Sequence, residues 1–594
     1  MGLTNVALQM AKTAMQAQRM GLEVAGNNVS NANNEDYSRR RVRLVSNPDI
    51  RLAQHITMGT GVGVSGTERI VDVFLIDRLR EAGSECASLD QQRQTLRRIE
   101  GIYNELGDSD LSTMMNGFFS AVGDMQNFPD KPAQRQLVVT LAENLTEQFR
   151  MLRREIDQAR TAINGQFDAA VDTVNSLAAQ IAEVNAEIVR SEGGGMYRGS
   201  AAALRDLRDG MLRELSSLVT VDVFEQTSGA VEVQVGSHSL VSGGEYYGLR
   251  VESALAYDST TGEWITRIEE LDDPEDVQDM PLRYAVFELD SSPLRTEGGM
   301  IHGFLSSRDE ILAGQAESLD RLVSSFVFEI NKLHSEGCGL EFFDDVRSFE
   351  SVDDADAVLS DAGLAFSPQN GGFNIRVHDL ATGQVKTINI QVDLDGIGAD
   401  DSLNTLVGKI NTAMTAAGLN VSATVNADNT LSIASSAADT QFSFNDYTSD
   451  VLAALGVNTF FTGTNSANVD VNQVVRDNIN LVAAALSPVP DDGSNAARIV
   501  DFRSATVTEL GGLNIEEFYQ SVISELAIDA SITASRSDGA AAYRESLLSE
   551  REAVSGVSID EEAINMMRYQ RAFQAAARYV TVVDELVKTM LALV

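Results

Sequence analysis

"SIDEEAINMMRYQRAFQAAARYVTVVDELVKTMLALV", residues 558–594, decides the fold at one end of this chain. Ser558 is followed three residues later by Glu561, which is the capping-box pattern that starts a helix. Apolar or small residues then recur in steps of three and four, the period of one helix face, at Met566, Tyr569, Phe573, Ala576, Val580, Val583, Val587, Met590 and Val594. The spacing predicts an amphipathic helix that runs to the last residue.

The first residues carry a similar stripe, made mostly of small side chains that permit close helix approach. It consists of Leu3, Ala7, Met10, Ala14, Ala17, Gly21 and Val24. A single amphipathic helix is marginally stable in water, so each stripe needs a partner. Two arrangements stay open: the terminal helices pack on the main body, or they pair with each other and with neighbouring subunits.

Long helices are expected where proline is absent, because proline breaks a helix interior. The chain has no proline between Pro132 and Pro274, or after Pro490. A coiled-coil-like stripe lies in the first of these stretches and ends at the glycines 193–195; its members are Phe167, Val171, Val174, Leu177, Ile181, Val184 and Ile188. A second helix is predicted over 200–218, and a third over 301–334.

Short strands are predicted between and after these helices. Alternating apolar residues indicate strands at 221–226, 230–236 and 239–243. Acidic, turn-rich sequence indicates a surface insertion over about 255–300. Residues 345–470 form a self-contained β-rich module with one helix at 402–418 and a hairpin at 421–435. Helices return at 472–486, 515–535 and 540–553. The fold class is therefore mainly α with inserted β modules, a multi-domain α+β protein.

Charge and composition limit the possible partners. The 594 residues include 45 Lys and Arg against 87 Asp and Glu, a formal net charge of −42. Such a surface repels nucleic acid and anionic membranes, so neither is an expected partner. The sequence has no apolar run of about 18 residues that could span a membrane, and residues 1–20 lack the apolar core of a cleaved signal peptide. Cys86 and Cys338 are expected to form no disulfide.

Catalytic motifs are absent from the sequence. The histidines His55, His238, His302, His334 and His378 show no metal-binding grouping. There is no P-loop, dinucleotide-binding glycine motif or nucleophile elbow. The acidic turn 393–401 has Ile397 and Asn404 where an EF-hand loop requires Asp or Asn and then Glu, so a calcium loop of that type is rejected. We therefore expect a chain that is not an enzyme and needs no metal or cofactor.

The polar stretch after the first stripe, "AGNNVSNANNEDYSRRR" at 25–41, carries a resemblance to a known family. Its segment 27–31, NNVSN, with Tyr37 in the aromatic place, resembles the N-terminal signature of bacterial flagellar axial proteins. The continuation through Arg39 resembles the hook-associated protein 1 (FlgK) family in particular. Glu35 and Asp36 depart from that pattern, because the family usually has a Thr-x-Gly turn there.

The C-terminal stretch resembles the same family more closely. The match begins at 555–562, SGVSIDEE, and continues through Asn565, Tyr569, Gln570, Phe573, Ala575, Ala577, Arg578, Asp584 and Glu585. Segments 404–433 and 455–472 resemble parts of the family's outer module and of its return to the helical trunk. The resemblance covers both ends and much of the middle of the chain.

The resemblance implies a non-enzymatic structural subunit of the flagellum. It implies a ring at the hook–filament junction, with hook protein, hook-associated protein 3 and further copies of the chain as partners. It also implies export of the unfolded chain by the flagellar type III system, without a cleaved signal, to an extracellular location. A cytoplasmic export chaperone is expected to bind near the C-terminal helix.

Pattern and resemblance together predict the domain limits. Axial segments are expected at 1–45 and 556–594, where the terminal helices form a coiled coil. The other parts are an extended linker at 46–85, a helical trunk at 86–344 and 471–555 that includes the 255–300 insertion, and a β-rich outer domain at 345–470.

Several residues are then expected at the assembly interface. Asn27, Asn28 and Asn31 are predicted to cap the first helix and to bond neighbouring subunits. Tyr37 is predicted to anchor the chain as it leaves the core, and the arginines 39–43 to meet acidic surfaces of adjacent subunits. The full set is Asn27, Asn28, Asn31, Tyr37, Arg39, Ile559, Met566, Tyr569, Phe573, Val580 and Val587.

Three alternatives remain. A hook protein or hook-associated protein 3 would belong to the same axial class. A secreted adhesin with coiled-coil ends would require a signal peptide or an anchor. An enzyme within 345–470 would require a clustered acid, base or nucleophile.

Overall fold

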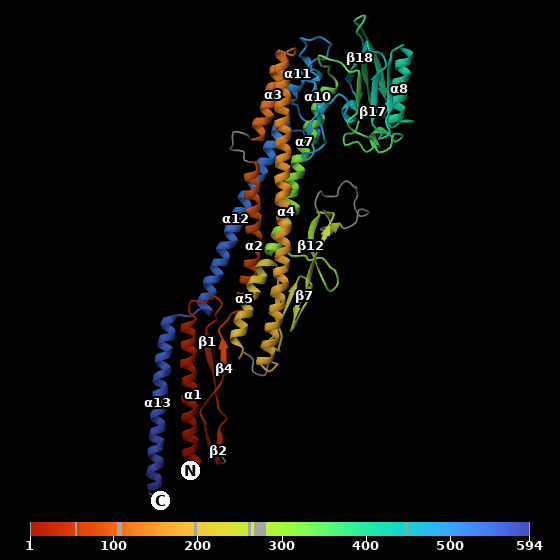
Figure 1. Ribbon diagram of the computed structural model, residues 1–594. Helices are drawn as coiled ribbons and strands as arrows, with labels where there is room; N and C mark the ends of the chain where they lie inside the picture. The colour runs from red at the N-terminus through yellow and green to blue at the C-terminus, as the bar shows by residue number, and fades with distance from the viewer. Residues whose placement is uncertain are drawn as a thin grey trace. The chain divides into compact units, whose positions relative to one another are not determined.

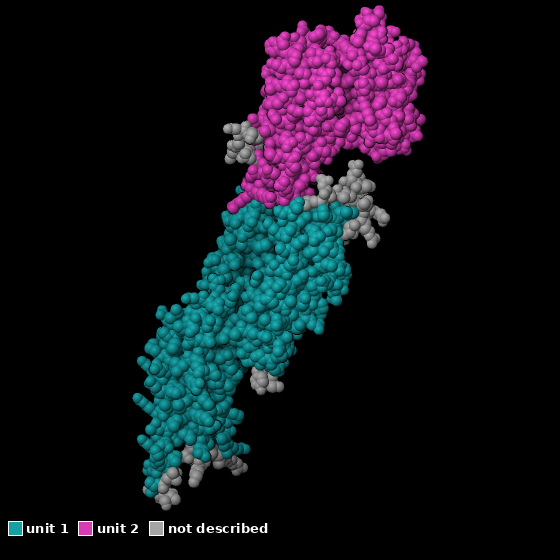
Figure 2. Space-filling view, in the orientation of Figure 1, with its two compact units in different colours: residues 1–95, 161–309, 531–594 teal, residues 96–160, 310–530 magenta. Residues whose placement is uncertain are grey.

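The structure is a computed structural model that describes residues 2–53, 56–103, 110–194, 199–258, 263–265, 281–446 and 448–592. The chain divides into two compact units (Figure 2). Unit 1 comprises residues 1–95, 161–309 and 531–594, and unit 2 comprises residues 96–160 and 310–530. Three α-helices of the described residues contribute to both units: α2 (Val73–Tyr103), α4 (Pro132–Ser191) and α12 (Ile515–Ser555).

The terminal helices belong to unit 1 and pair with each other. Helix α1 (Gly2–Ser30) lies alongside α13 (Ile559–Ala592) over much of its length (Figure 1). This confirms pairing of the two ends and excludes, for this chain, the packing of each end separately on the main body. Ser558 accepts a hydrogen bond from the Glu561 backbone N–H, 3.4 Å, and so starts α13 as predicted.

A β ribbon packs on α1. Strand β1 (Arg40–Ser46) pairs antiparallel with β4 (Val62–Arg69), and β2 (Ile50–Ala53) pairs with β3 (Ile56–Met58) beyond them. Residues 46–85, predicted as an extended linker, therefore contain strands and the first turns of α2. Two-stranded ribbons are marginal in water, and contact with α1 supplies the missing support.

Helix α4 is longer than its predicted stripe. It begins at Pro132, where the missing N–H and fixed φ of proline suit the first position of a helix. The stripe from Phe167 to Ile188 is buried throughout, as its period predicted. Gly193 and Gly194 adopt left-handed φ values of 58° and 65° and end the helix.

The remainder of unit 1 combines short helices and small sheets. Its elements are α5 (Ala202–Leu218), the sheet β5 (Asp222–Glu225), β6 (Val231–Val235), β7 (His238–Ser242) and β8 (Glu245–Tyr246), the pair β9 (Leu249–Ala254) and β12 (Leu282–Phe287), the pair β10 (Ala256–Asp258) and β11 (Glu263–Ile265), and α6 (Gly299–Ser306). The predicted insertion over 255–300 is narrower than expected, because β12 pairs with β9 and is buried. Residues 259–262 and 266–280 lie outside the described residues.

Unit 2 has an aromatic core between α3 (Leu111–Asn127) and α7 (Ala313–Ser335). The ring of Phe326 lies 5.8 Å from that of Phe118 and 5.5 Å from that of Phe461, between ring centroids. The helix predicted over 301–334 is instead α6 and α7, joined by a π-helical turn at Ser307–Leu312.

The predicted β module forms the other part of unit 2. Its sheets are β15 (Gln384–Val392), β14 (Gly371–Asp379) and β18 (Thr440–Asp446), then β13 (Asp345–Arg347), β17 (Leu431–Ser435) and β16 (Val421–Val425), and lastly β19 (Phe461–Thr462) and β20 (Asp470–Val471). Helix α8 (Leu403–Ala416) starts at a capping box of Ser402 and Thr405. A short helix, α9 (Val451–Ala454), follows β18. The predicted strand alternation, hairpin and helix are confirmed.

The prediction of helices at 472–486, 515–535 and 540–553 is partly wrong. The helix expected over 472–486 is only α10 (Gln473–Asp477), because Asn478 uses its side chain to start a 3₁₀ turn at Ile479–Leu481. Helix α11 (Ser494–Phe502) was not predicted. The two helices predicted within 515–553 form one helix, α12. The fold class is confirmed as mainly helical with several small sheets, and the limits of the axial, trunk and outer domains stay a prediction.

Candidate assembly site at the terminal helices

The predicted stripe of α13 faces α1. Val583 is 6% exposed, and the predicted interface residues on this stripe are half-buried: Met566, Tyr569, Phe573, Val580 and Val587. The closest fit is at Gly21 of α1, because a Cβ atom at that position would lie 2.7 Å from the Tyr569 ring carbons Cδ1 and Cε1. The absence of a side chain at Gly21 therefore makes room for the aromatic ring.

Helix α13 also carries a second apolar stripe that the sequence analysis missed. Its members, Ile564, Met567, Tyr579, Val582 and Leu586, are between 47% and 61% exposed. Their spacing was a signal in the sequence, although it is interrupted by Arg571 and Ala575. Ile559, predicted at the interface, is likewise exposed. We call the five residues 564, 567, 579, 582 and 586 the outer stripe.

The last turn of α1 is tied to the strand that follows it through Asn28. This side chain is fully buried, and its Oδ1 accepts hydrogen bonds from the Tyr37 hydroxyl, 2.7 Å, and from the Arg40 backbone N–H, 3.1 Å. Its Nδ2 donates to the Arg40 carbonyl, 2.9 Å. Asn28 thus bonds within its own chain, which corrects the expectation that it reaches a neighbouring subunit. Burial raises the pKa of the Tyr37 hydroxyl, against the opposing charge of Arg40.

Asn27 and Asn31 close the end of α1. The Asn31 Nδ2 donates to the Asn27 carbonyl, 2.9 Å, and to the Asn27 Oδ1, 2.8 Å. The Asn31 backbone N–H also bonds back to the Asn27 carbonyl. These bonds lie in the last turn of α1, and the capping role of the pair stays a prediction. Both residues lie at the surface, and their contact with a neighbour stays a prediction.

Arg39 fastens the start of α13 to the N-terminal segment. Its backbone N–H donates to the Ser555 carbonyl, 3.0 Å. Its guanidinium lies 2.7 Å from the Glu562 carboxylate and 2.9 Å from the Glu561 carboxylate. The Glu562 side chain is only 4% exposed, so this contact is shielded from solvent. Sequence reasoning missed Glu562 because an acidic residue in the first turn of a helix is usually explained by the helix dipole.

The neighbouring arginines also find partners within the chain. The Arg40 guanidinium binds the Asp206 carboxylate of α5, 2.7 Å, and Arg69 binds both Asp206, 2.8 Å, and Asp209. Burial raises the pKa of the Asp206 carboxyl even though two arginines contact it. Arg41 pairs with Glu68 across the β1–β4 ribbon. Arg41 and Arg43 are exposed, and the contact of these arginines with adjacent subunits stays a prediction.

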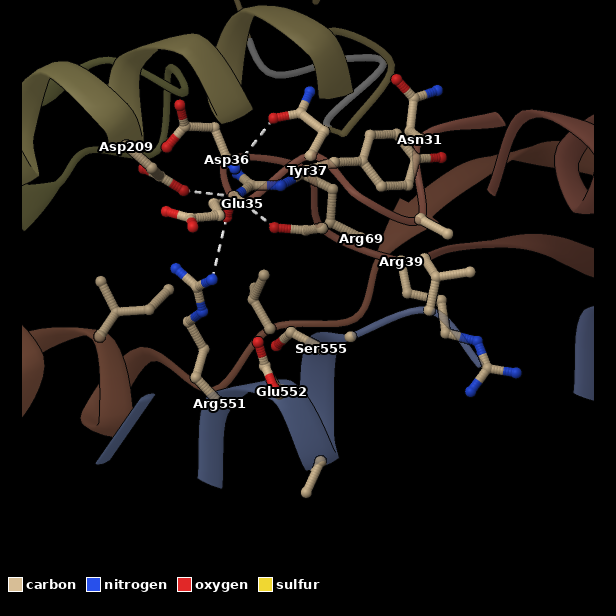
Figure 3. A pocket seen from close by; sticks show the side chains of 18 of the residues that line it. Asn31, Glu35, Asp36, Tyr37, Arg39, Arg69, Asp209, Arg551, Glu552 and Ser555 are labelled. Atoms are coloured by element: carbon tan, nitrogen blue, oxygen red, sulfur yellow. Dashed lines mark hydrogen bonds and ion pairs between the residues drawn. The ribbon is translucent and has the colours of Figure 1, made fainter. Parts of the chain in front are cut away.

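Glu35 and Asp36, the departures from the family signature, hold the loop after α1 in place. The Glu35 carbonyl accepts a hydrogen bond from the Arg551 guanidinium of α12, 2.9 Å. The Asp36 carboxylate binds the Arg213 guanidinium of α5, 2.6 Å. Figure 3 shows Arg551 directed toward Glu35 from the opposite wall. Contacts with two helices therefore fix a loop that has no glycine.

A hollow of about 640 Å³ lies beside this loop. Its walls are the loop, the start of α2, part of α5 and the turn between α12 and α13 (Figure 3). Five arginines and five carboxylates line it in equal number: Arg39, Arg69, Arg80, Arg213 and Arg551, and Glu35, Asp36, Asp209, Glu552 and Glu561. Balanced charge of this kind suits internal ion pairs rather than a charged small molecule.

Among the described residues, the titratable side chains form no arrangement typical of catalysis. His334 is buried; its Nδ1 lies 2.8 Å from the Asn458 carbonyl, and its Nε2 accepts from the Ala483 N–H. His378 stacks on Phe342 at 3.9 Å. Carboxylate oxygens of Asp393, Asp395 and Asp400 lie within 4.8 Å of one another at the surface, which is common without a metal. No helix in the described part of the chain is both long enough and apolar enough to cross a membrane.

Acid is expected to weaken unit 2 through His334 and His378. Burial lowers the pKa of each to about 4, from an ordinary value of 6.5. The unfolded chain therefore binds more protons, and the stability each histidine contributes is present above pH 6.5 and is lost as the pH falls toward 4. Each pKa unit corresponds to about 1.4 kcal/mol.

Denaturant unfolding of the wild type and of His334→Asn and His378→Asn, from pH 7.5 to pH 4.5, measures this effect. The difference in unfolding free energy between wild type and variant should shrink in acid. His238→Asn is the control, because this histidine lies in unit 1 and its replacement leaves both buried histidines of unit 2 in place. If the unfolding free energy of the wild type and of both variants fell in parallel with pH, the proposed contribution of His334 and His378 would be contradicted.

Two family models match the chain. Residues 96–343 match the model described as "Flagellar hook-associated protein FlgK helical domain", and residues 550–593 match "Flagellar basal body rod FlgEFG protein C-terminal". Flagellar hook-associated protein 1 of Bacillus subtilis (strain 168) is 25% identical over 617 aligned residues, which cover 98% of this chain and 97% of that protein. Flagellar hook-associated protein 1 of Escherichia coli (strain K12) is 24% identical, covering 96% of each.

A solved structure titled as the flagellar hook junction protein FlgK from Burkholderia pseudomallei aligns with a TM-score of 0.47 and 15% identity, over 81% of this chain and 100% of that chain. Paired terminal helices on a helical body with small β modules, together with relatives aligned over nearly the full length, define a structural protein of the bacterial flagellum. Within that class, the chain is similar over nearly its full length to flagellar hook-associated protein 1, and its residues 96–343 match the FlgK helical domain.

Proposed function

We propose that this chain forms the ring at the junction of the flagellar hook and filament, between hook protein and hook-associated protein 3. The outer stripe of α13 carries the proposal. It is a row of large apolar side chains that the described parts of the chain leave exposed. Exposed apolar surface of this extent marks a contact with other molecules. Because the other stripe of α13 already packs on α1, the outer stripe is free to pack on neighbouring subunits.

The predicted interface residues take two roles in this proposal. Met566, Tyr569, Phe573, Val580 and Val587 hold α13 on α1, and Asn28, Tyr37 and Arg39 fix the angle at which this pair leaves the chain. Asn27, Asn31 and Ile559 lie at the surface, where a neighbouring subunit can reach them. The residues that bond or pack within the chain thus hold the outer stripe in position, and Asn27, Asn31 and Ile559 form part of the contact surface itself.

The remaining features follow from the family. The chain is a structural subunit without enzymatic activity or cofactor, and it is exported unfolded by the flagellar type III system to the extracellular junction. An export chaperone binds near α13 in the cytoplasm. Unfolded export suits the fold, because α1 and α13 are single helices that become stable only when both ends of the chain can pair. Nucleic acid is not a partner, given the net charge of −42.

Removal of residues 550–594 tests the junction role. In the bacterium that encodes this chain, a deletion of its gene should leave hooks without filaments and release flagellin monomers into the medium. The full-length gene should restore filaments. The truncated gene should not, because α13 and its outer stripe are missing.

An immunoblot of the medium for the truncated chain separates failed assembly from failed export. Circular dichroism of the purified truncated chain checks that the remainder folds. Normal filaments in the gene-deletion strain, or full rescue by the truncated chain, would overturn the proposal.

A further inference from the structure

We propose that neighbouring copies join head to tail, with the outer stripe of α13 in one copy packed on the β1–β4 ribbon of the next. This inference rests on the proposed assembly function and identifies the two surfaces that meet. Each copy would use both surfaces, one toward each neighbour.

The two surfaces lie on opposite sides of α1. Helix α1 contacts α13 and also contacts β1 and β4, so it forms the middle layer of the terminal part (Figure 1). At Gly61 the ribbon approaches closely, because a Cβ atom there would lie 3.2 Å from the Met10 Cα. A copy therefore presents α13 on one side of α1 and the ribbon on the other.

The ribbon has uncovered apolar side chains of its own. Leu44, Val45 and Ile50 are 45%, 43% and 44% exposed. Successive residues of a strand point to opposite faces, so the exposure of both Leu44 and Val45 shows that both faces of the ribbon are open there, just beyond the β1–β4 bulge between Arg43 and Leu44. Beyond this bulge the ribbon offers apolar contacts that nothing in the described part of the same chain covers.

Charge favours an acidic partner for the ribbon. Residues 40–69 contain five arginines against one aspartate and one glutamate, and Arg40, Arg41 and Arg69 bind carboxylates of the same chain. Arg43 lies beside Leu44 and is exposed. On α13, Glu585 directly precedes Leu586 of the outer stripe, whereas the Asp584 carboxylate pairs with Lys588 of the same helix, 2.7 Å. A second copy therefore supplies an apolar surface for Leu44, Val45 and Ile50 and a carboxylate for Arg43.

Two different surfaces that pair with each other produce a heterologous contact. Contacts of this type repeat from copy to copy and close into a ring or continue as a helix, whereas a surface that pairs with itself stops at a dimer. The opposite placement of the two surfaces thus fits an assembly of many copies around an axis.

Chemical cross-linking in assembled flagella tests the pairing. Val45→Cys on the ribbon and Leu586→Cys on α13 are placed in one chain and also separately, in a strain that lacks the native gene. Isolated hook–filament structures are treated with a flexible bismaleimide. The native Cys86 and Cys338 are buried, so the wild-type chain is the blank.

The double variant should give a ladder of linked copies, at least tenfold more abundant than in either single variant. A second pair, Leu44→Cys with Val582→Cys, repeats the test if the first variant assembles poorly. Dimers from Leu586→Cys alone would overturn the inference, because they would show the outer stripe meeting itself. Filaments that grow normally while both double variants stay unlinked would also overturn it, and would leave the junction role intact.

Discussion

Replacing Gly21 by leucine is expected to separate α1 from α13 and to stop filament growth. A Cβ atom at Gly21 already overlaps the Tyr569 ring at 2.7 Å, and a leucine side chain adds three more carbons at the same place. Overpacking of this kind costs about 1–3 kcal/mol. Because a pair of single helices is only marginally stable, that cost is expected to shift the pair toward separated helices. Hydrogen exchange of α1 and α13 amides in the full chain should show the loss of protection.

Gly26→Leu is the matched control on the same helix. A Cβ atom at Gly26 meets no atom within 4 Å, and leucine is a better helix former than glycine by about 0.8 kcal/mol. This variant should keep the amide protection of α13 and support filaments. Equal protection in the two variants would mean that Tyr569 does not depend on the space at Gly21.

Replacing Arg135 by alanine is expected to lower the unfolding free energy of unit 2 by about 3–5 kcal/mol. Arg135 is 1% exposed, and its guanidinium donates to the carbonyls of Pro129, 2.8 Å, Val482, 2.6 Å, and Ile479, 3.4 Å. Alanine leaves these acceptors without their donor and leaves a cavity in the core. Burial lowers the pKa of Arg135 to about 10, a sign of how poorly this charge is solvated.

Denaturant unfolding of the full chain measures this loss. Arg135→Lys should recover only part of the stability, because an ammonium group lacks the planar fork that reaches three carbonyls. Arg154→Ala is the matched control on the same helix. Its side chain is 54% exposed and pairs with Glu147 at the surface, so less than about 1 kcal/mol should be lost. Similar losses from Arg135→Ala and Arg154→Ala would refute the role of the buried guanidinium.

Much of the local structure could be predicted from residue patterns. The stripe from Phe167 to Ile188 is buried as its period required, and the glycines after it end α4. Ser558 starts α13, and the β module has its expected hairpin and helix. The helix expected over 472–486 does not form, because the Asn478 side chain accepts a hydrogen bond from the backbone and starts a tight turn. Helix propensity summed over a stretch of sequence does not detect a single competing hydrogen bond of this kind.

The candidate site could be located from the sequence, but the hydrogen bonds and ion pairs within it could not be predicted. The segment 25–41 was singled out by its amides and arginines, but the bonds that Asn28 and Arg39 make within the chain were not predicted. Their partners are far away along the sequence, and one sequence gives no measure of which distant residues meet. The same limit hid the contacts of Glu35 and Asp36 with Arg551 and Arg213.

The sequence by itself determined that both ends of the chain are amphipathic helices in need of a partner, because that property depends only on the spacing of side chains along a helix of fixed period. The tertiary structure decided which surfaces remain exposed. It pairs α13 with α1 through the space at Gly21, places the ribbon on another side of α1, and leaves the outer stripe uncovered. Burial is a property of distant segments brought together, and only their positions in space determine it.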